Sequence, residues 1–68
     1  MLKIEINGEY IELIKLLKLA GLCDSGGAAK VAVDEGYVKV DGVVEGRKRC
    51  KIRKGQKVEI DGNFIEVE

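Results

Sequence analysis

The chain has 68 residues, of which 46% are hydrophobic and 35% charged, and its formal net charge is zero. This length allows one domain with a small core, and this composition excludes a disordered segment. The charge is unevenly distributed, because residues 47–54, called the basic segment below, hold six of the twelve Lys and Arg residues. The other sixty residues carry six Lys against twelve acidic residues, a net charge of −6. We expect a single, electrically polarised domain over residues 1–68.

Neither a membrane segment nor a metal site is expected. No run approaches the roughly 20 apolar residues that span a bilayer, and Met1 leads directly into a strand-like pattern without a signal-peptide core. The chain has no His, and Cys23 and Cys50 alone are too few ligands for a tetrahedral zinc site. We therefore expect a cytoplasmic protein with no cofactor, in which free thiols are favoured over a disulfide.

A strand and a helix are predicted first. Residues 2–6 alternate apolar and charged side chains, which predicts a strand, and Asn7-Gly8 suits a tight turn after it. From Ile11 to Ala20 the apolar residues recur at helical spacing, so the period changes and a helix begins. Gly21 is a suitable C-terminal stop for this helix.

A second helix is predicted to start at a cap residue, Asp24 or Ser25, and to end at Gly36. Gly26 and Gly27 occupy its first turn and weaken it. Two interpretations of this pair stay open. The glycines would either let a phosphate approach the backbone N–H groups or let the two helices pack closely.

Beyond Gly36 the period returns to two, which indicates strands. Asp41-Gly42 and residues 61–63 separate these strands, and the first pair accepts the positive φ of a hairpin turn. Four strands are predicted here, at residues 37–40, 43–45, 57–60 and 64–67.

The predicted fold class is α+β, with two packed helices against a small, mainly antiparallel sheet. One core should form where the helices meet the sheet. Its candidate residues are Leu13, Leu16, Leu17, Leu22, Ala29, Ala32, Val33, Val38, Val40, Ile52, Val58 and Ile60.

Five segments of the chain stand in the order of a known family and at nearly its spacing. They are residues 16–22 (LLKLAGL), 25–30 (SGGAAK), 35–42 (EGYVKVDG), 47–51 (RKRCK) and 54–58 (KGQKV). Between residues 11 and 60 the chain resembles the S4-like RNA-binding domain, and specifically its short, free-standing bacterial branch, the YbcJ-like proteins. The resemblance implies the αL motif, in which basic residues on the second helix and on a sheet-side loop hold RNA without catalysis.

The resemblance also implies which residues bind RNA here. Many S4 domains place an Arg directly after the helix-capping Ser, where this chain has Gly26, although the free-standing branch commonly shows the Gly-Gly form. The helix is therefore expected to contribute less charge than in ribosomal relatives. By position, the RNA-binding residues would be Lys30 on the helix, then Arg47, Lys48, Arg49 and Lys51, with Arg53 and Lys54 close behind.

Arg47 and Arg49 are the leading candidates among these, because a guanidinium binds phosphate oxygens bidentately. An extended conformation would place Arg47, Arg49, Lys51 and Arg53 on one face, and Ile52 on the opposite face toward the core. Such a row of cations would follow a nucleic-acid backbone.

Recognition of single-stranded sequence usually requires aromatic side chains that stack on bases. This chain has only Tyr10, Tyr37 and Phe64. Tyr37 either stacks on a base or covers the core from a strand edge. We therefore expect a monomer that recognises the shape and backbone of structured RNA, with ribosomal RNA and a ribosome-associated role as candidates and no small-molecule substrate.

Other interpretations compete with RNA binding. Residues 3–11 also resemble the opening hairpin of β-grasp sulfur carriers, which act through a C-terminal Gly-Gly, whereas this chain ends with Val67-Glu68. The basic segment could dock an acidic protein partner, or could serve as a solvated face that keeps the chain soluble. No nucleophile and base stand out for catalysis, but five basic neighbours could lower the pKa of Cys50 and make it redox-sensitive.

Overall fold

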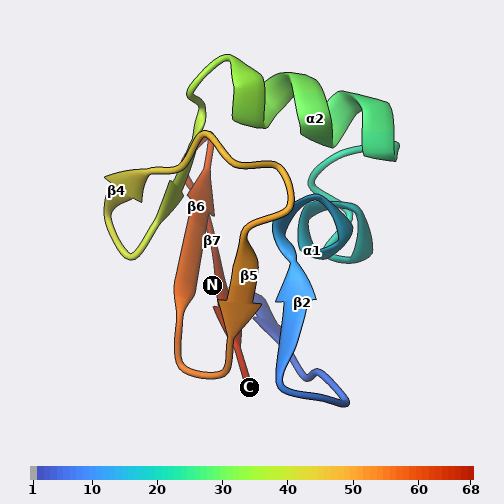
Figure 1. Ribbon diagram of the computed structural model, residues 1–68, viewed down its shortest axis with the longest axis vertical. Coiled ribbons are helices and arrows are strands. Elements are labelled where there is room, and N and C mark those ends of the chain that lie inside the picture. Colours follow the sequence, from blue (N-terminus) through green and yellow to red (C-terminus); the bar gives the residue numbers. More distant parts are fainter. Residues whose placement is uncertain (1) are drawn as a thin grey trace.

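The computed structural model describes residues 2–68, which form helices and strands in the order shown in Figure 1. The helices are α1 (Leu13–Leu19) and α2 (Gly26–Asp34). The strands are β1 (Leu2–Ile4), β2 (Tyr10–Glu12), β3 (Val38–Val40), β4 (Val43–Val44), β5 (Lys51–Arg53), β6 (Lys57–Ile60) and β7 (Asn63–Val67). No helix within residues 2–68 is both long and apolar enough to cross a bilayer.

The strands form two sheets. The larger sheet has the order β1-β7-β6-β3-β4, and the smaller one pairs β2 with β5. Every pairing is antiparallel except the parallel contact of β1 with β7. Figure 1 shows α2 across one end of the larger sheet and α1 beside β2, with the two helices in contact. The α+β class with a mainly antiparallel sheet is confirmed.

Local turn chemistry explains the hairpins. Asp41 (φ 50°) and Gly42 (φ 85°) join β3 to β4, and Asp61 (φ 50°) and Gly62 (φ 79°) join β6 to β7. Two successive positive φ angles give the turn whose twist matches paired strands. Both connections lie where the sequence predicts them.

The second helix matches its prediction, whereas the start of the first does not. The Ser25 hydroxyl oxygen accepts a hydrogen bond from the N–H of Ala28 at 3.1 Å, which selects Ser25 over Asp24 as the cap of α2. The prediction that a helix begins at Ile11 is wrong, because Tyr10–Glu12 form β2 and α1 begins at Leu13. Ile11 pairs with Ile52 of β5, so tertiary pairing overrides the helical spacing.

Backbone carbonyls from a distant segment cap α1. Glu12 makes no side-chain capping bond, and instead the N–H of Leu13 donates to the carbonyl of Cys50 at 2.9 Å. The N–H of Ile14 donates to the carbonyl of Lys48 at 3.2 Å. These bonds satisfy donors that a helix leaves unpaired at its first turn, and they bind the segment between β4 and β5 to α1.

The core joins both helices to both sheets. Leu13, Leu16 and Leu17 of α1 are fully buried against residues of α2 and the strands. Ten of the predicted core residues are buried, and Leu22 and Ala32 pack against the cluster while half-buried. The prediction omitted four members of the core, which are Ile6, Cys23, Ile65 and Val67.

The strand pairing shows that the β-grasp interpretation is wrong. Its opening hairpin would pair β1 with β2, but β1 pairs with β7 and β2 pairs with β5. The close-packing interpretation of the glycine pair is also wrong. A Cβ added at Gly26 would meet nothing within 4 Å, and one at Gly27 would meet only the Ser25 hydroxyl oxygen at 3.7 Å.

Two alanine substitutions should change stability in opposite directions. Gly21 has a φ of +76°, and a Cβ added there would meet no atom within 4 Å. Gly21→Ala should therefore lower the free energy of unfolding by about 1–2 kcal/mol through backbone strain alone. Gly26→Ala should raise it by roughly 0.5 kcal/mol, because alanine favours the helix and meets no neighbour. Urea denaturation followed by circular dichroism measures both, and a change of the same sign in the two variants would contradict this account.

Candidate nucleic-acid interface

The basic segment alternates between exposed and covered side chains. Arg47, Arg49, Lys51 and Arg53 are exposed, whereas Lys48 and Cys50 are half-buried and Ile52 is fully buried. Only residues 51–53 are a strand, however, and the N–H of Cys50 bonds back to the carbonyl of Arg47 at 3.1 Å in a turn. The segment is therefore extended only over residues 51–53, and the single face of an extended chain does not continue back to Arg47. The alternation arises because β5 pairs with β2, while the preceding turn folds against α1.

Lys30 and Lys48 come together from different elements. Lys30 is exposed on α2, and Lys48 lies in the turn before β5. Contact with Lys30 lowers the pKa of Lys48, because a second ammonium group nearby destabilises the charged form of Lys48. The carboxylate of Asp34 partly opposes this effect. A phosphate placed beside both would relieve the repulsion. The helix side and the loop side of the predicted interface thus meet at this pair.

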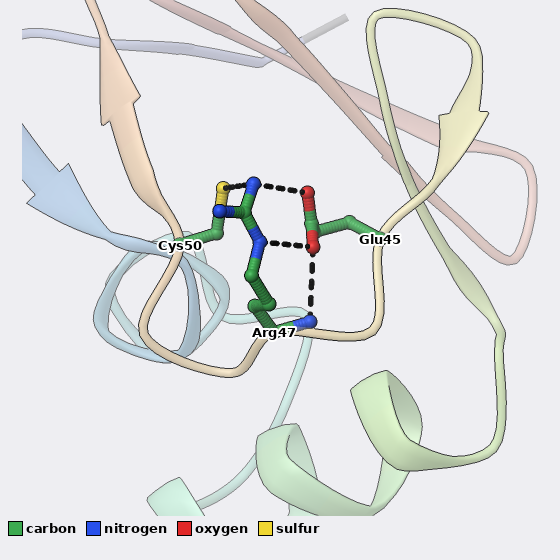
Figure 2. A network of polar contacts seen from close by, with 3 residues as sticks. All are labelled: Glu45, Arg47 and Cys50. Carbon is green, nitrogen blue, oxygen red and sulfur yellow. Dashed lines mark hydrogen bonds and ion pairs between the residues drawn. The ribbon is translucent and has the colours of Figure 1, made fainter.

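Arg47 is held by Glu45. Figure 2 shows the guanidinium Nε donating to one carboxylate oxygen of Glu45 at 2.9 Å and Nη2 donating to the other at 3.1 Å. The backbone N–H of Arg47 also donates to Glu45 at 3.0 Å, and these bonds lower the pKa of Glu45 to about 2. The pairing also raises the pKa of Arg47. Arg47 therefore presents to solvent only the donors that Glu45 leaves free.

The remaining cations extend along the β2–β5 ribbon. Arg49 lies 3.9 Å from Glu12, which is too far for a hydrogen bond, and Glu12 also lies 3.5 Å from the ammonium of Lys15. Lys51 and Arg53 lie over the ring of Tyr10, at 4.9 Å and 5.9 Å from its centroid. Lys54 follows β5 in an exposed turn.

Two surface depressions differ in their chemistry. One is lined by Arg47, Arg49, Cys50 and Lys51. The other is lined by Tyr37, Ile60 and Asp61 and has no basic side chain. Since phosphate recognition requires cations, we place the candidate interface at the first. Tyr37 is 64% exposed, so the interpretation that it covers the core is wrong.

The environment of Cys50 makes its thiol less acidic. Burial and the neighbouring Glu45 raise the pKa of Cys50, although the Nη2 of Arg47 donates to its sulfur at 3.7 Å. The expectation that basic neighbours lower this pKa is therefore wrong, because the adjacent turn places a carboxylate as well as a cation beside the sulfur. Cys50 and the buried Cys23 are free, which confirms the prediction of free thiols.

The sequence interpretation overlooked three neighbours of the interface, which are Tyr10, Glu12 and Glu45. Both Tyr10 and Glu12 lie on β2, a strand that the sequence does not predict because the expected helix begins at Ile11, so their position opposite β5 is visible only in the structure. The closeness of Glu45 to Arg47 in the sequence was the available signal for their ion pair. No group of three or more acidic, thiol or imidazole side chains that could hold a metal occurs within the described residues.

The sequence profile of the S4 domain matches residues 4–68. The chain belongs to the S4 domain family. This confirms the family that the spacing of residues 16–58 indicated, and the match reaches into the strands on both sides of that region.

The similar proteins include one of nearly the same length as this chain and one much longer enzyme. "Putative RNA-binding protein YbcJ" of Escherichia coli (strain K12) is 55% identical over 58 residues, which are 85% of this chain and 83% of that protein. The solution structure of YbcJ, described as revealing an αL motif involved in RNA binding, superposes with a TM-score of 0.76 at 48% identity, covering 98% of this chain and 86% of that one. The tyrosine–tRNA ligase of Ralstonia nicotianae is 42% identical over 53 residues, 78% of this chain but only 14% of that enzyme.

Acid should weaken the Glu45–Arg47 pair. Because folding lowers the pKa of Glu45 from 4.5 to about 2, its stabilising effect is complete above the ordinary value and is lost as pH falls toward the folded value. Wild type should therefore lose more stability between about pH 5 and pH 2.5 than Glu45→Gln, as measured by urea midpoints. The control Glu9→Gln, which removes an exposed carboxylate, should follow wild type. Equal acid sensitivity of Glu45→Gln and wild type would contradict the pairing.

Alkylation should report the environment of Cys50. Iodoacetamide should alkylate Cys50 more slowly than it alkylates the thiol of free glutathione at the same slightly alkaline pH. The reason is that the raised pKa leaves a smaller fraction of Cys50 as thiolate. Glu45→Gln should accelerate the reaction, since it removes the carboxylate that raises the pKa. Peptide mass spectrometry separates Cys50 from Cys23, and rapid alkylation of Cys50 in the wild type would argue against the assignment.

Proposed function

We propose that this protein is a non-catalytic, single-domain RNA-binding protein that holds structured RNA on the surface formed by α2 and the basic segment. The observation that carries the proposal is the meeting of Lys30 with Lys48 beside the exposed cations of the basic segment, in a chain whose net charge is zero. Membership of the S4 domain family supports it, as do the name of YbcJ and the motif described for its structure.

The cations contribute to RNA binding in two ways: the Lys ammonium groups act as point charges, and the Arg guanidinium groups act as oriented hydrogen-bond donors. The ammonium groups of Lys30 and Lys48 repel each other, and a phosphate beside them would offset that repulsion. Arg49 has no hydrogen-bonded carboxylate and keeps its guanidinium fork for phosphate oxygens. Arg47 contacts RNA with the donors that its Glu45 pair leaves free.

The full set of proposed contacts follows the surface from α2 to the end of β5. An array on a folded scaffold suits the regular backbone of a structured RNA, since the backbone offers phosphates at fixed intervals. We further propose that the protein acts as a monomer in the cytoplasm, with ribosomal RNA as a candidate ligand. The proposed RNA-binding residues are Lys30, Arg47, Lys48, Arg49, Lys51, Arg53 and Lys54.

The test is a fluorescence-anisotropy titration of an RNA hairpin over a salt series. If four to six phosphates are neutralised, log affinity should fall against log salt with a slope of roughly −3 to −5. The triple variant Lys48→Gln, Arg49→Gln, Lys51→Gln should lose most of the affinity and reduce the slope by about 2–3. These substitutions leave the Arg47–Glu45 pair intact.

A second triple variant distinguishes binding at the proposed site from attraction by the net charge of the protein. Lys3→Gln, Lys39→Gln and Lys57→Gln remove the same charge from exposed positions on the larger sheet. This control should retain its affinity within a few-fold at moderate salt, where distant charges are screened. Equal loss in both variants would show attraction by net charge alone. Absence of RNA binding by the wild type would overturn the proposal and direct attention to an acidic protein partner.

A further inference from the structure

The outer face of the β2–β5 ribbon carries an aromatic ring, Tyr10, with two cations over it. Tyr10 is directly opposite Arg53 in the antiparallel register, and Ile11 is opposite Ile52. Ile52 is fully buried and Ile11 packs against the core, so the Tyr10–Arg53 pair lies on the opposite, solvent-facing side. Tyr10 is 43% exposed there. The ring is therefore accessible at the end of the basic surface.

The neighbouring cations orient the ring and define what it can bind. The ammonium of Lys51 lies 4.9 Å from the ring centroid and the guanidinium carbon of Arg53 lies 5.9 Å away, both within cation–π range. These contacts restrict the ring before any ligand arrives. A nucleotide offers the two matching groups, because its base stacks on an aromatic face while its phosphate meets the cations.

The charge around Tyr10 distinguishes it from the other exposed aromatic residues of the described chain. Within residues 2–68, cations lie over the ring of Tyr10 and over neither Tyr37 nor Phe64. Tyr37 instead shares its depression with Asp61, and Phe64 is opposite Glu59, whose other neighbour in the sheet is Lys39. A carboxylate repels the phosphate of a stacked nucleotide.

Tyr10 also has a carboxylate nearby, but that one is balanced. Glu12 follows it on the same face of β2. Its carboxylate lies 3.5 Å from the ammonium of Lys15 and 3.9 Å from the guanidinium of Arg49. The net field around the ring is therefore favourable to an anion.

We propose that Tyr10, flanked by Lys51 and Arg53, forms a stacking site for one unpaired nucleobase of the bound RNA. This inference rests on the proposed function, since the same basic surface holds the phosphates next to the stacked nucleotide. The ligand is then a structured RNA in which a bulged or flanking base adjoins a helix, and a continuous duplex leaves the site empty. The ring accepts any base, because stacking needs only a π face.

The test compares two RNA hairpins that differ only in one bulged nucleotide. Tyr10→Leu keeps an apolar side chain but removes the π face, so the bulged hairpin should bind roughly 5- to 100-fold more weakly. The continuous hairpin should change by no more than about twofold. Tyr10→Phe keeps the ring and should bind both hairpins like the wild type.

A fluorescence measurement leaves Tyr10 itself unchanged. The chain has no Trp and two Tyr residues, so in a Tyr37→Phe background Tyr10 is the sole tyrosine fluorophore. Stacking should quench its emission when the bulged hairpin binds and much less when the continuous hairpin binds. Circular dichroism checks that each variant is folded.

The outcomes separate this inference from the proposed function. Salt-dependent binding of both hairpins with equal affinity and equal quenching would overturn the stacking site and leave the RNA-binding surface standing. An equal loss of affinity for both hairpins in Tyr10→Leu would also overturn it, because the ring would then support the surface generally. Failure of the wild type to bind either hairpin would overturn both proposals.

Discussion

Two backbone hydrogen bonds, from the N–H groups of Leu13 and Ile14 to the carbonyls of Cys50 and Lys48, determine where the basic segment lies. The first turn of α1 has no side-chain cap, so these carbonyls satisfy donors that would otherwise stay unpaired. Pairing of β2 with β5 extends the contact, and Ile52 anchors it in the core. The backbone of the segment is thus engaged in the fold, while all of its charged side chains except the half-buried Lys48 remain exposed for a ligand.

Carboxylates around the basic segment allow six positive charges to coexist on a small domain. Glu45 fixes Arg47 through two side-chain hydrogen bonds, and Glu12 lies between Lys15 and Arg49. Each carboxylate offsets part of the local repulsion. Lys30 and Lys48 are only partly compensated by the carboxylate of Asp34, and the pKa of Lys48 stays lowered by its contact with Lys30. The surface therefore combines guanidinium groups that carboxylates orient with one pair of ammonium groups whose repulsion is only partly offset.

Elements specified by local chemistry were predictable, and elements specified by distant partners were not. Asp41-Gly42 and Gly36 act through their positive φ angles, as predicted. Ser25, one of the two predicted cap residues, acts through its own hydroxyl oxygen. By contrast, Ile11 fits both an apolar helical stripe and a short strand, and only its pairing with Ile52 decides between them. For the same reason Tyr10 was not recognised as a neighbour of Arg53.

The sequence by itself determined the α+β class, the family, the free thiols and the concentration of positive charge in one segment. These follow from hydropathy period, turn residues and composition, which are properties of neighbouring positions. Only the tertiary structure decided that Lys30 meets Lys48 and that Glu45 holds Arg47. It also decided that burial, together with Glu45, raises the pKa of Cys50, and that Tyr10 lies beneath Lys51 and Arg53. Those relations depend on strand register and on the packing of α1 against the basic segment, which no local pattern specifies.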